Sequence, residues 1–159
     1  MQDERLWLDE MWRSHAGSIY AYAVRRVGRD AAEDVVADTF VVAWRHRDRR
    51  PQRPLPWLYG VARRVIATRR RAERRRALLV HRIAGGAAGV ANPATESVDA
   101  GDALAGLSRG DREALLLSAW EGLAADEAAV VLGISPSAYR KRLSRARRRL
   151  ETLTGGDPK

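Results

Sequence analysis

Cysteine is absent from the 159-residue chain, so disulfide bridges and thiolate metal sites are excluded. The three histidines, His15, His46 and His81, lie far apart and lack the spacing of metal ligands. The sequence also lacks a carboxylate pair, a serine–histidine arrangement and a phosphate-cradling glycine loop. We therefore expect a protein that is not an enzyme and that carries no metal or other cofactor.

Long apolar runs are missing as well. No stretch of about 18 consecutive apolar residues is present, which excludes a transmembrane helix and direct insertion into a membrane. The charged segment 1–15 lacks the basic start and apolar centre of a signal peptide. We expect the protein to be cytoplasmic.

Acidic residues are the minority, because 20 Asp and Glu against 29 Lys and Arg give a net charge of +9. Lysine contributes only Lys141 and Lys159, and arginine contributes the rest. This balance favours a polyanionic partner, with nucleic acid first and an anionic membrane surface second.

Strand-like alternation is nearly absent, whereas helical periodicity runs through most of the chain. The pattern predicts an all-α fold. The expected helices span about 4–14, 16–27, 30–47, 57–82, 104–120, 124–132 and 135–153. Gly28 is expected to end the second helix, and Asp30 is expected to cap the third, with Glu33 completing a capping box.

Two segments interrupt the helical pattern. Pro51, Pro54 and Pro56 predict a loop before the fourth helix, since proline fixes φ and has no amide donor. A small, polar, glycine-rich stretch predicts a flexible linker. The predicted parts are a small helical domain at 1–83, a linker at 84–101, a second small helical domain at 102–153 and a tail at 154–159.

Residues 121–150 have the pattern of a helix-turn-helix. A compact apolar helix precedes Gly133, which suits the turn because glycine adopts positive φ at little cost. Ser135 is a good N-cap, and Pro136 suits the first helical position. Helix, short turn and helix in this order are typical of a DNA-binding motif.

The second helix of this motif has two contrasting faces. Tyr139, Leu143, Ala146 and Leu150 recur at helical spacing and are expected to point inward. The remaining surface carries potential donors to phosphates and base edges: Ser137, Lys141, Ser144 and Arg148, flanked by Arg140, Arg142, Arg145, Arg147 and Arg149. The alternative is a merely solvated basic helix, and the preceding short helix and turn favour DNA binding.

The stretch AEDVVADTFVVAW, residues 32–44, carries a different kind of surface. Its apolar face consists of Ala32, Val36, Phe40 and Ala43. Beside that face lies a mixed stripe of Asp34, Asp38, Val41 and Arg45. The stripe is either an ordinary solvated surface or one that is presented to a protein partner.

The stretch PWLYGVARRVIATRRR, residues 56–71, combines aromatic and basic side chains. Leu58, Ala62, Val65 and Ile66 are expected to face a core. Trp57 and Tyr59, followed by several arginines, suit unstacked single-stranded bases, because rings stack on bases while guanidinium groups hold phosphates. Trp57 could equally close the core. The run 69–76 is expected to be a solvated face that touches nucleic-acid backbone.

Taken in order, these stretches resemble the extracytoplasmic-function (ECF) sigma factors of bacterial RNA polymerase. Residues 32–44 resemble region 2.2, residues 56–71 resemble regions 2.3 and 2.4, and residues 107–150 resemble region 4. The resemblance implies a promoter-specificity subunit that binds core RNA polymerase and both double-stranded and melted promoter DNA. It implies a region 2 helical bundle and a region 4 helix-turn-helix joined by the linker.

The resemblance also implies residue roles. Asp34, Asp38 and Val41 would contact the β′ clamp helices of the polymerase, and region 4 would meet the β flap. The loop 47–56 and the following helix would recognise and melt the minus-ten element, using Trp57, Tyr59, Arg63, Arg64 and Arg70. The minus-thirty-five element would be read by Arg140, Lys141, Ser144 and Arg145. Ser137 and Arg142 would contact its phosphates, and Arg148 would also bind this element. An anti-sigma factor is a common partner in this family.

Some positions depart from the family pattern. Arg64 stands where many members have asparagine, and residues 137–139 read Ser-Ala-Tyr where many read Gly-Thr-Val. Ala124 stands where serine or threonine is common, which removes a side-chain cap and costs about 1 kcal/mol. Two other classes remain open: a stand-alone helix-turn-helix regulator that uses only 104–150, and a sigma-like chain that binds polymerase or an antagonist without initiating transcription.

Overall fold

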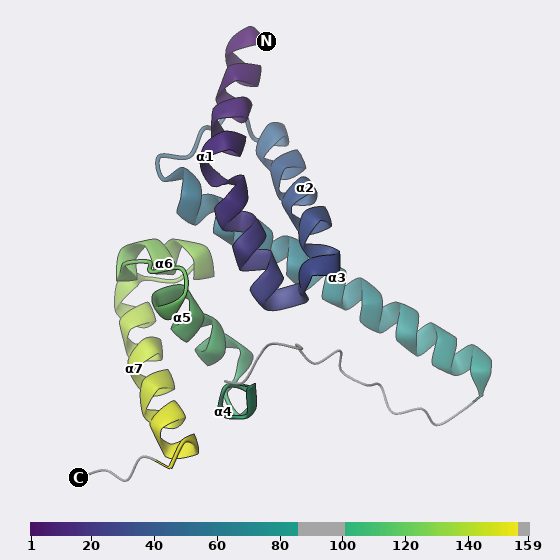
Figure 1. The fold of residues 1–159 in the computed structure, drawn as a ribbon, viewed down its shortest axis with the longest axis vertical. Helices are drawn as coiled ribbons and strands as arrows, with labels where there is room; N and C mark the ends of the chain where they lie inside the picture. The colour runs from purple at the N-terminus through teal and green to yellow at the C-terminus, as the bar shows by residue number, and fades with distance from the viewer. Residues whose placement is uncertain (86–100, 156–159) are drawn as a thin grey trace. The chain divides into compact units, whose positions relative to one another are not determined.

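The computed structural model describes residues 1–85 and 101–155, and these residues form seven helices. Every regular element in the described residues is helical, which confirms the predicted all-α class (Figure 1). The contacts divide the chain into two units, Met1–Glu96 and Ser97–Lys159. Most of the predicted linker, 86–100, and the last four residues of the tail lie outside the described residues.

The first unit is built from three helices. These are α1 (Gln2–Val27), α2 (Arg29–Arg45) and α3 (Pro54–Ala84), and each packs against the other two. The chain reverses at Gly28, whose φ of 80° is easily adopted only by glycine, so α1 and α2 lie side by side (Figure 1). All three helices contribute buried side chains to the core, among them Met11, Ile19, Tyr22, Val35, Phe40, Leu58, Tyr59 and Ile66.

Three local predictions for this unit were wrong. Pro54 and Pro56 were expected in the loop, but α3 begins at Pro54, and both prolines lie in its first turn, where the missing amide donor would be unpaired anyway. The expected helices 4–14 and 16–27 form one continuous helix, because the exposed Gly17 costs only about 1 kcal/mol while Ile19 and Tyr22 beyond it are fully buried. The helix that was expected to be capped by Asp30 is α2, which begins at Arg29 with Gly28 as its N-cap. Asp30 therefore lies in the first turn of α2 rather than at the cap. There its negative charge still suits the positive end of the helix.

The second unit contains four described helices. They are α4 (Gly101–Ala105), α5 (Arg109–Ala119), α6 (Ala125–Leu132) and α7 (Pro136–Leu153). The pattern at 104–120 is not one helix: Ser108 starts α5 anew, and its hydroxyl accepts a hydrogen bond from the Asp111 amide at 3.2 Å. A core cluster of Leu107, Leu115 and Ala146 packs with neighbouring leucines between α5 and α7.

Tyr139 fixes α7 against α5. Its ring is 1% exposed, and its hydroxyl donates to the Ala114 carbonyl at 2.8 Å. Burial raises the pKa of Tyr139 above its ordinary value, against an opposing effect from the Arg147 charge. The phenol therefore stays protonated, and able to donate this hydrogen bond, to a higher pH than an ordinary tyrosine.

The helix-turn-helix geometry is confirmed. Gly133 adopts φ 66° in the turn between α6 and α7, and the Ile134 amide donates to the Ala129 carbonyl at 3.1 Å. The Ser135 hydroxyl caps α7 by accepting from the Ala138 amide at 3.1 Å. Ala124 has no side-chain oxygen to offer, but the Glu127 carboxylate accepts from its amide at 3.0 Å, so half of a capping box persists.

Candidate nucleic-acid interface

The outer face of α7 is a continuous polar and basic surface. Tyr139 and Ala146 are buried, and Leu143 and Leu150 pack against the core, as the helical spacing predicts. The side chains assigned to DNA from the sequence are exposed, except that Arg142 is partly buried: Ser137, Arg140, Lys141, Arg142, Ser144, Arg145 and Arg148. The helix thus has one dry face that fixes its position and donors on the other.

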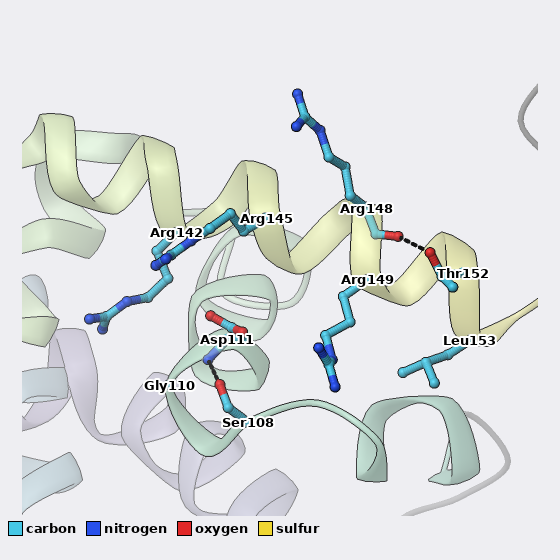
Figure 2. Close-up of a pocket in the computed structure, with 9 residues that line it drawn as sticks. All are labelled: Ser108, Gly110, Asp111, Arg142, Arg145, Arg148, Arg149, Thr152 and Leu153. Atoms are coloured by element: carbon cyan, nitrogen blue, oxygen red, sulfur yellow. Dashed lines mark hydrogen bonds between the residues drawn. The ribbon is translucent and has the colours of Figure 1, made fainter.

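A groove between α7 and the first turn of α5 extends this surface. Arg142 packs over Gly110, since a Cβ at that glycine would lie 3.6 Å from the Arg142 Nη1. Arg149 reaches from α7 toward Ser108, whereas Arg148 extends away from α5 (Figure 2). From the sequence, Arg149 was predicted only to flank the DNA-binding face. Its place in the groove beside α5 was missed, because the periodicity of one helix does not show which helix lies next to it.

The mixed stripe on α2 is exposed. The Asp34 and Asp38 side chains are 72% and 51% exposed, and Val41 is 47% exposed. Arg69 of α3 lies across the stripe. Its Nη2 and Nε are 2.5 Å and 3.1 Å from the Asp38 Oδ2, and its Nη1 is 3.9 Å from the Asp34 Oδ2.

The start of α3 places Trp57 at a half-buried position. The ring meets His46 edge to face, with 6.1 Å between the centroids. Arg63 is half-buried and Arg64 is exposed. Trp57 is therefore neither fully buried nor fully exposed, so both interpretations of this residue remain open.

Two of the residues assigned to the minus-ten element make contacts inside the first unit, and neither is fully exposed. Tyr59 is only 4% exposed, and its ring packs on Tyr22 with 5.2 Å between centroids, so it cannot stack on a base in this conformation. Arg70 is half-buried and donates from Nη2 to the Arg26 carbonyl at 2.9 Å. The signal for Tyr59 was present in the sequence, because PWLYGVA is apolar on all sides and so predicts burial on more than one face.

The basic run 69–76 is only in part the solvated face that the sequence predicts. Residues 71–76 are exposed, whereas Arg69 and Arg70 are half-buried and make the contacts described above. Among the residues the structure describes, no group of three or more potential ligands could hold a metal ion. Within the same ranges, none of the helices combines the length and apolar character needed to cross a bilayer.

Both units match family models of known proteins. Residues 11–76 match the family model for sigma-70 region 2, and residues 97–150 match the model for sigma-70 region 4. The chain is 33% identical over 151 residues to the ECF RNA polymerase sigma factor SigL of Mycobacterium tuberculosis, which covers 88% of this chain and 84% of that protein.

Two solved structures are similar over almost the whole chain. One is the sigma factor RpoE in complex with the anti-sigma factor NepR from Bartonella quintana, with a TM-score of 0.65, 27% identity and coverage of 99% of this chain and 100% of that one. The other is CnrH in complex with the cytosolic domain of CnrY, with a TM-score of 0.63, 32% identity and coverage of 95% and 89%. CnrH is an RNA polymerase sigma factor of Cupriavidus metallidurans.

Proposed function

Because this chain belongs to the ECF sigma factors and directs transcription initiation by RNA polymerase, we propose that its two units divide promoter recognition between them. The family is not enzymatic, so promoter opening has to come from binding energy alone. The first unit would bind core polymerase and the melted minus-ten element, and the second would read the minus-thirty-five element. The protein would act in the cytoplasm. The predicted boundaries 1–83 and 102–153 belong to this proposal.

The minus-thirty-five element is assigned to the outer face of α7. The observation that carries the assignment is the pairing of a buried Tyr139 with an exposed row of donors at Arg140, Lys141 and Ser144. A helix held in this way can enter the major groove, where guanidinium and ammonium groups can donate to guanine O6 and N7. Arg145 would join these donors at the base edges, Ser137 and Arg142 would contact phosphates, and Arg148 would also bind the element.

Core polymerase is assigned to the stripe of Asp34, Asp38 and Val41 on α2. Exposed carboxylates around an exposed valine suit a basic partner surface with an apolar centre, as the β′ clamp helices would offer. The family resemblance adds the β flap as a partner of the second unit.

The minus-ten element is assigned to the loop 46–53 and the start of α3. Trp57 can stack on an unpaired base, while Arg63 and Arg64 can hold phosphates on either side of it. Stacking and backbone contacts together would offset the few kcal/mol that each flipped base loses when it leaves the duplex. Tyr59 and Arg70 act in this proposal as supports of α3 rather than as DNA contacts.

An anti-sigma factor is the remaining proposed partner. RpoE is bound to NepR and CnrH is bound to CnrY in the two similar structures. Since this chain shares their fold over almost its full length, we assign it an antagonist of the same general kind.

The direct test is transcription by purified bacterial core polymerase with and without this chain, on sheared genomic DNA from its source. The 5′ ends of the RNA products are mapped. Discrete new starts that share two upstream elements would support the division of labour proposed here. Core binding without new starts would favour a sequestering protein, and duplex binding without core binding would favour a stand-alone regulator.

A further inference from the structure

The loop between α2 and α3 is tied to the beginning of α1. Arg50 Nη2 lies 2.5 Å from the Asp3 Oδ2, and Arg47 Nε lies 3.3 Å from the Glu4 Oε2. The Arg50 guanidinium also lies 5.7 Å from the centre of the Trp7 ring. These contacts join residues more than 40 positions apart, so they depend on the fold and not on local sequence.

Arg47 connects this first turn to the end of α2. Its guanidinium lies 4.4 Å from the centre of the Trp44 ring, and its Nη1 donates to the Trp44 carbonyl at 3.0 Å. Its side chain is 30% exposed and that of Glu4 is 27% exposed, so solvent screens this ion pair less than it screens the pair of Arg50 and Asp3. The Arg47 Nε is buried and has no well-aligned hydrogen-bond acceptor. The nearby negative charge of Glu4 therefore offsets the free-energy cost of burying this nitrogen.

The loop therefore has contacts with all three helices of the first unit. Arg47 and Arg50 attach it to α1, the His46 Nδ1 lies 2.9 Å from the Val42 carbonyl of α2, and the His46 ring meets Trp57 at the start of α3. Two ion pairs and a cation–π contact acting on one short loop are more than an isolated surface pair, whose effect is usually negligible. Contacts of this kind restrain the loop, and a restrained loop would lose less conformational entropy on binding DNA.

We propose that the N-terminal end of α1, through Asp3 and Glu4 in its first turn and Trp7 in its second, is a positioning element that sets which bases the loop 46–53 accepts in the melted strand. The inference rests on the proposed function of the first unit. Asp3 and Glu4 do not themselves touch DNA in this account, because carboxylates would repel the phosphates. Their role is to hold Arg47 and Arg50 on the protein side of the loop.

The test uses the full chain bound to core polymerase and a promoter library whose minus-ten region is randomised. The promoter is one mapped with the wild-type protein. Bound templates are sequenced to give the preference at each position. The double variant Asp3→Asn, Glu4→Gln is expected to flatten the preference by about threefold to tenfold at one or more positions, while affinity for core stays unchanged. Glu10→Gln is the matched control, since this exposed carboxylate is on the same helix.

A charge exchange separates positioning from general damage. Glu4→Arg alone and Arg47→Glu alone place like charges together and are each expected to flatten the preference. The combined variant Glu4→Arg, Arg47→Glu is expected to restore most of it. The inference would be overturned if the exchange variant failed to restore the base preference or if the double variant kept the wild-type preference. It would also be overturned if the variants lost affinity for core polymerase to the same extent as they lost base preference. If the wild-type protein itself showed no minus-ten preference, the proposed function of the first unit would fail instead.

Discussion

Arg69 on α3 covers Asp38 on α2, with a guanidinium nitrogen 2.5 Å from the carboxylate oxygen. The same side chain reaches Asp34 at 3.9 Å, so a single arginine lies over both carboxylates of the stripe assigned to polymerase. A basic group of the polymerase would have to share these oxygens with Arg69 or displace it. If the stripe is the polymerase interface proposed above, Asp34, Asp38 and Arg69 together would set the strength of core binding.

Replacing both carboxylates tests the stripe itself. Asp34→Asn with Asp38→Asn is expected to weaken core binding at least tenfold at low salt, because close interfacial charge pairs contribute about 1.5 kcal/mol or more. Fluorescence anisotropy of labelled protein with core enzyme measures the affinity. Asp30→Asn, an exposed carboxylate at the start of the same helix, serves as the control and is expected to bind core normally. Normal binding by the double variant would remove the stripe from the interface.

Removing the covering arginine gives the opposite change. Arg69→Gln is expected to tighten core binding about twofold to fivefold at low salt, since it uncovers one negative charge, and the gain is expected to shrink as salt is raised. The same titration, repeated over a range of salt concentrations, measures this. Weaker binding would mean that Arg69 orients Asp38 for the polymerase instead of competing with it.

The outer face of α7 predicts two kinds of effect. Lys141→Ala is expected to relax sequence preference in the minus-thirty-five element by about 1–3 kcal/mol at one position. Arg147→Ala removes the same charge from the flank nearer the buried face, and it is expected to weaken all sequences alike. Footprinting of the complete holoenzyme on promoter variants distinguishes the two. Equal loss of preference in both variants would argue against base reading by Lys141.

Trp57 and Tyr59 are expected to differ although both are aromatic and close in sequence. Trp57→Ala is expected to lower holoenzyme affinity for a non-template-strand oligonucleotide by about 1–3 kcal/mol, the usual contribution of a stacked base. Tyr59→Phe is expected to leave it unchanged, because the buried ring retains its packing on Tyr22. Oligonucleotide binding by fluorescence anisotropy measures both. A large loss for Tyr59→Phe would place its hydroxyl at the DNA.

Tyr139→Phe is expected to destabilise the second unit by about 1 kcal/mol through loss of the hydrogen bond to Ala114. The raised pKa of Tyr139 adds a pH dependence: its contribution to stability is complete below the ordinary value of 10.0 and is lost as pH rises toward the folded pKa. Hydrogen exchange of α5 and α7 amides in the full chain measures both. The phenylalanine variant should lack that alkaline component, and retention of the whole component would assign it to another group.

Local features of the sequence predicted the helix-turn-helix of the second unit well, although they missed the break between α4 and α5. Gly133, Ser135 and the inward row of Tyr139 and Ala146 behave as expected, because turns, caps and helical faces depend on neighbours within a few residues. The same reasoning failed at Gly17, where a weak local break was overridden by burial of α1 against its neighbours.

Helix class, the turn, the α7 cap and the polarity of each exposed face were determined by the sequence alone, since they follow from backbone hydrogen bonding and from periodicity. Only the tertiary structure decided that Tyr59 is buried, that Arg69 covers Asp38 and that Arg47 reaches Glu4. Those contacts join helices that are distant in the chain. Their geometry depends on how the helices pack, which no pattern within a single helix contains.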